Sequence, residues 1–183
     1  MRRRRRQGIE MRMVAALVAT MVVACSPGVD GNEPGEWSNR TSGVGWRLLA
    51  DGRVDADEAY LVRAATDEAG YAGIWRELTL AGSAPPVDLS EEVVVSFAQG
   101  IGSSCPELRL DDVMIDDGEV SAAISDPIVD EFGSPRACTA DLVGAVVFVV
   151  ALERDVVPAD GFVLWLSEAA KPYTEPIEVE LEP

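Results

Sequence analysis

The sequence predicts an α+β fold, a mostly antiparallel β-sheet or sandwich with one principal helix packed against it. Three observations support this prediction. A single stretch, residues 67–79, carries apolar side chains at helical spacing; several later segments alternate apolar and polar residues; and residues 143–152 form an uncharged, valine-rich run. That run has ten residues, too few to span a membrane, and indicates a central strand buried on both faces. The length of 183 residues and the apolar fraction of 48% suit one globular domain.

The first part of the body contains the predicted helix. Residues 46–50 form a short apolar segment, and Asp51-Gly52 after it indicates a turn. Residues 59–65 are a predicted strand. Thr66 is the predicted N-cap of a helix over residues 67–79, whose apolar face consists of Tyr71, Ile74, Trp75 and Leu78. Ala84-Pro85-Pro86 ends this unit.

The second part is predicted to be β-structure. Residues 93–98 alternate in the manner of a strand, and the runs 108–115 and 119–124 flank Asp116-Asp117-Gly118, a hairpin signal. Residues 162–166 form another predicted strand. In the final predicted strand, apolar Ile177, Val179 and Leu181 alternate with glutamates. Over the whole chain we expect six to eight strands.

The N-terminus has the features of an export signal. Arg2 to Arg6 precede a run of twelve uncharged residues, 13–24, and Cys25 follows this run directly, so that the segment closes with Val22-Val23-Ala24-Cys25. This segment resembles a bacterial lipoprotein signal with its lipobox. The resemblance implies cleavage after Ala24, diacylglycerol on the Cys25 thiol, and a location on the extracytoplasmic side of the cell membrane, held by the lipid. The alternative is an ordinary secretory signal in which the cysteine occurs by chance.

These features divide the chain into three parts. Residues 1–24 are the predicted signal peptide, residues 25–45 the lipidated cysteine and a flexible tether rich in Gly, Pro and Ser, and residues 46–183 a single α+β domain.

Charge and composition exclude several functions. The chain has 32 acidic and 15 basic residues, a net charge of −17, and no His. Without the signal the net charge is −22 and Lys171 is the one remaining lysine. Such acidity argues against nucleic-acid binding. The missing His excludes imidazole bases and imidazole metal ligands. A Ser-Lys dyad would have to use Lys171, because the chain has no other lysine, and no Ser-x-x-Lys motif is present.

Two further chemistries stay open for the acidic residues. A pair of carboxylates could serve glycoside hydrolysis, but the sequence singles out no pair. Five acids lie close together in the hairpin region and could supply oxygen ligands for Ca²⁺, although the same acids also fit solvated turns; they are Asp111, Asp112, Asp116, Asp117 and Glu119. We therefore assign no catalytic residue, metal site or cofactor.

The remaining cysteines form an even pair. If Cys25 carries the lipid, Cys105 and Cys138 are the two cysteines that remain. Because the exported domain would lie in an oxidising compartment, they are predicted to form a structural disulfide. A reactive thiol pair is the alternative.

The body shows a family resemblance over residues 59–166. The order of elements resembles the C-terminal domain of PrcB-type protease-complex lipoproteins. In both, a strand leads into a helix that carries a Trp, a Pro-Pro-x-Asp segment follows, and a Val-rich strand ends in Gly. Here these features are Tyr60-Leu61-Val62, Trp75, Pro85-Pro86-Val87-Asp88 and the strand ending at Gly100. The family's Thr-Gly-Gly-Tyr is replaced here by Gly102-Ser103-Ser104-Cys105. The chain is also similar to uncharacterised lipoproteins of high-GC Gram-positive bacteria, through Ser104-Cys105-Pro106 and Cys138-Thr139. The first resemblance implies an accessory subunit that binds another surface protein.

Together these observations predict a surface-exposed, lipid-anchored binding or accessory module without catalysis. Its expected partners are the membrane, through Cys25, and another cell-surface protein. The alternatives are a carboxylate- or calcium-dependent hydrolase and a structural envelope protein.

Overall fold

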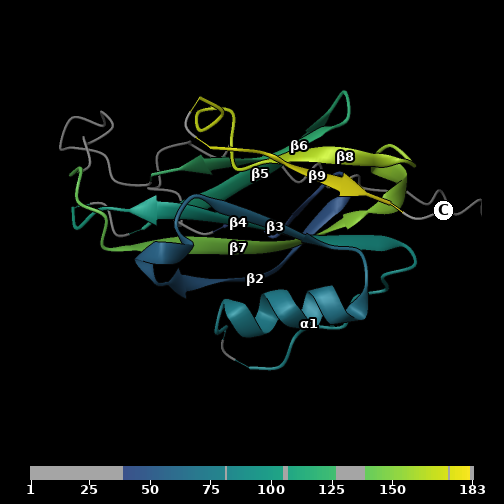
Figure 1. Ribbon diagram of the computed structural model, residues 1–183, viewed down its shortest axis with the longest axis horizontal. Helices are drawn as coiled ribbons and strands as arrows, with labels where there is room; N and C mark the ends of the chain where they lie inside the picture. Colours follow the sequence, from purple (N-terminus) through teal and green to yellow (C-terminus); the bar gives the residue numbers. More distant parts are fainter. Residues whose placement is uncertain (1–38, 81, 105–106, 127–138, 173, 182–183) are drawn as a thin grey trace, which may run out of the picture. The chain divides into compact units, whose positions relative to one another are not determined.

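A computed structural model describes residues 39–80, 82–104, 107–126, 139–172 and 174–181. Two β-sheets pack face to face in this body (Figure 1). The five-stranded sheet has the order β1-β2-β7-β4-β3, and the four-stranded sheet the order β5-β6-β8-β9. All strand pairs are antiparallel except β6 with β8. The fold is therefore of the predicted α+β class, dominated by antiparallel sheet, with one α-helix among the described residues.

The strands and the helix have the following bounds. The five-stranded sheet contains β1 (Ser42–Gly43), β2 (Trp46–Val54), β3 (Leu61–Ala65), β4 (Glu92–Ile101) and β7 (Gly144–Glu153). The four-stranded sheet contains β5 (Arg109–Asp116), β6 (Glu119–Ser125), β8 (Gly161–Trp165) and β9 (Ile177–Glu180). The helix α1 spans Glu68–Glu77, and two short 3-10 turns lie at Ala56–Glu58 and Arg154–Val156.

Strand β7 confirms the predicted central strand. It lies in the middle of the five-stranded sheet, and every residue except the last is buried. Phe148 and Val150 face the four-stranded sheet, whereas Val147 and Val149 face α1. Because both faces are covered, an uncharged run of this length is stable only in the middle of the layers.

The helix lies on the outer face of the five-stranded sheet (Figure 1). Tyr71, Ile74 and Leu78 are buried against that sheet, as their spacing predicts. The cap is Asp67 and not Thr66, because the Asp67 carboxylate accepts a hydrogen bond of 2.7 Å from the Gly70 amide.

Strand β2 corrects the predicted turn at Asp51-Gly52. The strand continues through both residues, which pair with Phe148 and Val147 of β7. A β-bulge at Leu49 shifts the register of the pairing with β7 between Leu48 and Ala50. The backbone hydrogen bonds that β2 makes along β7 outweigh the preference of Asp51-Gly52 for a turn.

The predicted hairpin forms between β5 and β6. Asp117 and Gly118 both have positive φ, 45° and 81°, the geometry of a type I′ turn. The first strand, β1, begins at Ser42, within the stretch assigned from sequence to the tether, and pairs with Arg47 and Trp46 of β2. Among the described residues no helix is long and apolar enough to cross a membrane.

Candidate functional site

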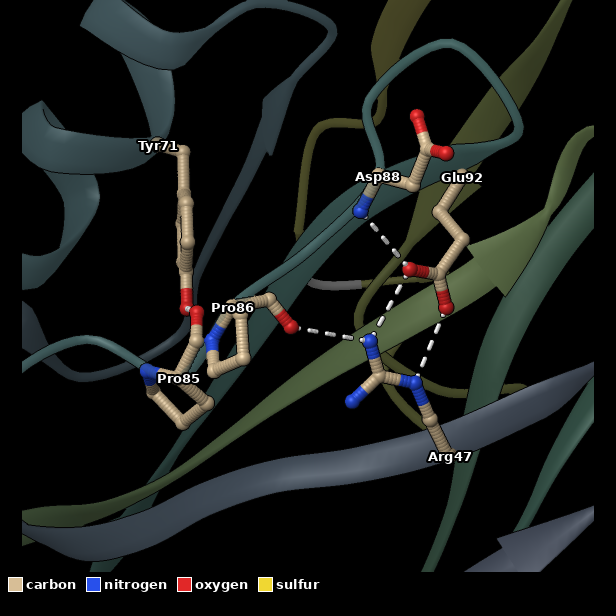
Figure 2. Close-up of polar contacts among 6 residues, drawn as sticks. All are labelled: Arg47, Tyr71, Pro85, Pro86, Asp88 and Glu92. Atoms are coloured by element: carbon tan, nitrogen blue, oxygen red, sulfur yellow. Dashed lines mark hydrogen bonds and ion pairs between the residues drawn. The ribbon is translucent and has the colours of Figure 1, made fainter.

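A polar cluster around Arg47 joins β2, β4 and the Pro85-Pro86 segment close to α1. Arg47 Nε and Nη2 each donate to one oxygen of Glu92, both at 2.9 Å, and Nη2 also donates to the Pro86 carbonyl at 3.3 Å (Figure 2). The Asp88 amide donates to Glu92 Oε2 at 3.2 Å. Both carboxylate oxygens of Glu92 are thus occupied by fixed donors.

The electrostatics of this cluster indicate a structural role. The hydrogen bonds from Arg47 lower the pKa of Glu92, and those same bonds raise the pKa of Arg47. Burial raises the pKa of Tyr71, whose hydroxyl donates to the Pro85 carbonyl at 2.9 Å (Figure 2). Glu92 stays ionised and Tyr71 stays neutral near pH 7, so neither is suited to move a proton there. The cluster clamps the Pro85-Pro86 segment to β2, β4 and α1.

Two hollows flank the loop that joins β8 to β9. The first, which we call the uncharged hollow, has a volume of about 440 Å³ and no charged lining residue among those described. The second, the acidic hollow, has a volume of about 520 Å³. The uncharged hollow is lined by Tyr60, Gln99, Ser167, Ala169, Ala170 and Thr174, and the acidic hollow by Met114, Asp116, Asp117, Glu119, Ser121, Glu168 and Lys171.

Tyr60 at the uncharged hollow has an unusual backbone conformation. Its φ is 64°, a region that bulky residues rarely adopt, and its amide donates to the Ala98 carbonyl at 2.7 Å. A Cβ on Gly100 would come within 2.7 Å of Tyr60 Cζ and 2.8 Å of Leu142 Cδ1, so these side chains pack directly on the Gly100 backbone. Tyr60 and Leu142 are still 47% and 45% exposed. Tyr60 and Leu142 therefore leave apolar surface accessible to solvent around Gly100.

The acidic hollow contains the cation Lys171. Its Nζ lies 2.5 Å from Glu119 Oε2, 2.8 Å from Glu168 Oε1 and 5.3 Å from the centroid of the Trp165 ring. Hydrogen bonds to Glu119 and Glu168 raise the pKa of Lys171, and the Lys171 hydrogen bond lowers the pKa of Glu119. A Ser-Lys mechanism needs an unprotonated lysine. Lys171 is held protonated, so it is unsuited to act as a general base.

The acids singled out from sequence are not gathered into one site. Asp111 pairs with Arg109, and Asp112 accepts from Arg40 at 2.7 Å and from the Trp46 indole at 2.9 Å. Asp116, Asp117 and Glu119 line the acidic hollow. Within the described ranges no group of three or more acidic or cysteine side chains could hold a metal ion.

The predicted cysteine sites lie outside the described residues, but the chain beside them is informative. Cys25, Cys105 and Cys138 are not among the described positions. Ser104, which precedes Cys105, contacts Thr139, which follows Cys138: the Thr139 amide donates to Ser104 Oγ at 2.8 Å. The disulfide between Cys105 and Cys138 stays a prediction.

No protein-family model, curated protein or solved structure matches the chain. The site must therefore be interpreted from its own geometry. From the sequence, Lys171 is named as the lysine of a Ser-Lys dyad and Tyr60 as part of a family resemblance, and neither residue is placed at a binding site. Glu119, a partner of Lys171, and Ala98, whose carbonyl accepts from the Tyr60 amide, come from distant strands, and no local sequence pattern predicts such contacts.

Proposed function

We propose that the protein is a lipid-anchored extracytoplasmic module that binds a basic segment of another cell-surface protein and performs no catalysis. The observation that carries the proposal is the pair of hollows, uncharged and acidic, on either side of the β8–β9 loop. An exposed uncharged hollow beside an acidic one is complementary to a polypeptide with neighbouring apolar and basic side chains.

The net charge supports a basic partner. The acidic hollow has four carboxylates and a single ammonium group, and the chain without its signal carries a net charge of −22. A field of this sign raises the association rate of cationic surfaces and repels anionic head groups. An anchor at Cys25 would hold the module at the membrane.

The state of the ionisable groups supports binding over hydrolysis. Lys171 is protonated, and Glu92 and Glu119 are ionised by their cationic partners. A general acid of a hydrolase needs a raised carboxyl pKa, and these two carboxyls are shifted in the opposite direction.

Site-specific photo-cross-linking in intact cells tests the proposal. A photoreactive residue replaces Met114 at the acidic hollow, Ala169 at the uncharged hollow, or the exposed Ala72 on α1 as the matched control. We expect the same protein adduct from positions 114 and 169 and none from position 72. Adducts of equal yield from all three positions, or none from 114 and 169, would reject the proposed binding face.

A further inference from the structure

The five-stranded sheet has one open edge, at β3. This strand pairs with β4 on one side, and no other strand among the described residues pairs with its second side. The opposite edge of the same sheet is joined to the four-stranded sheet, because the amide of Arg40, which precedes β1, donates to the Leu110 carbonyl of β5 at 2.8 Å. An open edge presents unpaired backbone N–H and C=O groups, to which a further strand can add.

A groove with a volume of about 500 Å³ lies along this edge. Residues 62–64 of β3 line it, together with residues of α1 and Ile177 of β9. The helix leaves room there, since a Cβ added to Gly73 would meet no other atom within 4 Å. The groove therefore has space beside β3 for a second extended chain.

The two faces of β3 give the groove two chemically different sides. Val62 and Ala64 pack against the core between the sheets, as does Ile177, and all three stay partly exposed at the border of that core. Arg63 lies on the helix side, where its Nε is 3.5 Å from Glu77 Oε2 of α1. Because side chains of a strand alternate, an added strand would place every second side chain against the apolar border and the others toward α1.

The helix side of the groove offers a positive charge. Arg76 of α1 lines the groove and is exposed. Arg63 is paired with Glu58 and Glu77, whereas Arg76 has no carboxylate partner among the residues that the structure describes. A carboxylate on the added strand would complement the guanidinium of Arg76.

We infer that an extended segment of the partner polypeptide adds to β3 as a further strand of the five-stranded sheet, with apolar side chains toward Val62 and Ala64 and an acidic side chain toward Arg76. The inference rests on the proposed function, because Tyr60, which lines the uncharged hollow, directly precedes β3. The exposed Leu61 lies between the hollow and the groove in sequence. A chain bound in the uncharged hollow is thus placed to continue along the open edge.

A partner chain suits this edge better than a second copy or the protein's own tether. The described chain begins at Asn39, beside β1, which is the opposite edge of the sheet. Two copies paired through β3 would bring together two bodies that each carry a net charge of −22 without the signal, and they would place equal charges of Arg76 at one interface. Like charges of this size oppose association.

Photo-cross-linking in intact cells tests where the segment lies. A photoreactive residue replaces Gly73 in the groove, or the exposed Ala72 beside it as the matched control. We expect position 73 to give the same protein adduct as position 169, and position 72 to give none. Arg76→Glu should lower the yield from position 73 about tenfold. Arg53→Glu, which makes the same change of charge at an exposed site on β2 outside the groove, should change it less than about twofold.

Amide hydrogen exchange tests the strand pairing itself. The adduct formed from position 169 is compared with the free full-length protein, both in the same detergent micelles. Backbone hydrogen bonds to an added strand protect amides that solvent reaches in the free protein. The rapidly exchanging amides of β3 should therefore exchange about tenfold more slowly or less in the adduct, whereas those of β1, at the opposite edge, should change less than about twofold.

Three results would overturn the inference: no adduct or a different adduct from position 73, equal yields in Arg76→Glu and Arg53→Glu, or unchanged exchange of the β3 amides. If any of these occurs while positions 114 and 169 still give their common adduct, the strand addition is wrong and the binding face stands. If positions 114 and 169 give no adduct, the proposed function and this inference fall together.

Discussion

A double-mutant cycle on Arg47 and Glu92 measures the clamp between β2 and β4. The two hydrogen bonds of 2.9 Å are charge-assisted and bidentate, and the side chains are 41% and 16% exposed. Exposed ion pairs contribute about 0.2–1 kcal/mol, and the bidentate geometry and the burial of Glu92 place this pair at the upper end. We therefore expect a coupling free energy of about 1 kcal/mol, after allowance for solvent screening at Arg47.

The single variants differ because they leave different groups unpaired. Arg47→Met leaves the Glu92 carboxylate with the Asp88 amide as its hydrogen-bond donor, and should lower the free energy of unfolding by about 2 kcal/mol. Glu92→Gln retains a polar partner and should cost about 1 kcal/mol. The double variant should cost about 2 kcal/mol, less than the sum of the two.

The pH dependence follows from the direction of the pKa shift. The folded-state pKa of Glu92 is lowered, so its contribution is fully present above the unfolded pKa of about 4.3 and is lost as pH falls through the folded pKa. Urea unfolding from about pH 7 to about pH 3 should show the coupling decline only at the acidic end.

The exposed pair Arg40–Asp112, with side chains 50% and 40% exposed, is the matched control and should show coupling below about 0.5 kcal/mol. A coupling between Arg47 and Glu92 below about 0.3 kcal/mol, or one that does not change with pH, would refute the reasoning.

Three other predictions concern the anchor, the disulfide and the core. Cys25→Ser should leave an unprocessed precursor without lipid on immunoblots, whereas processed protein in the membrane of this variant would contradict the anchor. Cys105 and Cys138 enclose 34 residues, so reduction of the predicted disulfide should lower stability by about 3.5 kcal/mol, and two free thiols in the non-reduced, denatured protein would rule it out. Phe148→Ala should lower the free energy of unfolding, measured in urea, by about 3–5 kcal/mol because Phe148 is fully buried between the sheets. The control Val44→Ala, at an 89% exposed position, should lower it by less than about 0.5 kcal/mol. Equal losses in the two variants would contradict the core assignment.

The elements that were predictable from sequence have strong local signals. The uncharged run of β7, the stripe on α1 and the Asp-Gly turn each follow from the residues they contain. The turn expected at Asp51-Gly52 failed because the neighbouring strand decided the conformation there. The helix cap differed by one residue because Asp67 is a better placed acceptor than Thr66.

The candidate site was much less predictable. Lys171 and Glu119 are 52 residues apart, and Arg47 and Glu92 are 45 apart. The contacts depend on which strands neighbour one another, and the parallel pairing of β6 with β8, which brings Glu119 and Trp165 onto one sheet, has no sequence signature. Acidic residues are so frequent in this chain that their identity alone does not mark the ones that form the hollow.

The most direct test of the binding face is the yield of the cross-linked adduct from position 169 after local charge reversal. Glu119→Lys places a second cation in the acidic hollow, whereas Glu180→Lys makes the same change of net charge on the exposed β9 strand outside it. We expect about a tenfold loss of adduct or more in Glu119→Lys and less than about a twofold change in Glu180→Lys, with equal amounts of folded protein in both. Equal yields in the two variants would contradict recognition of a basic partner at this hollow.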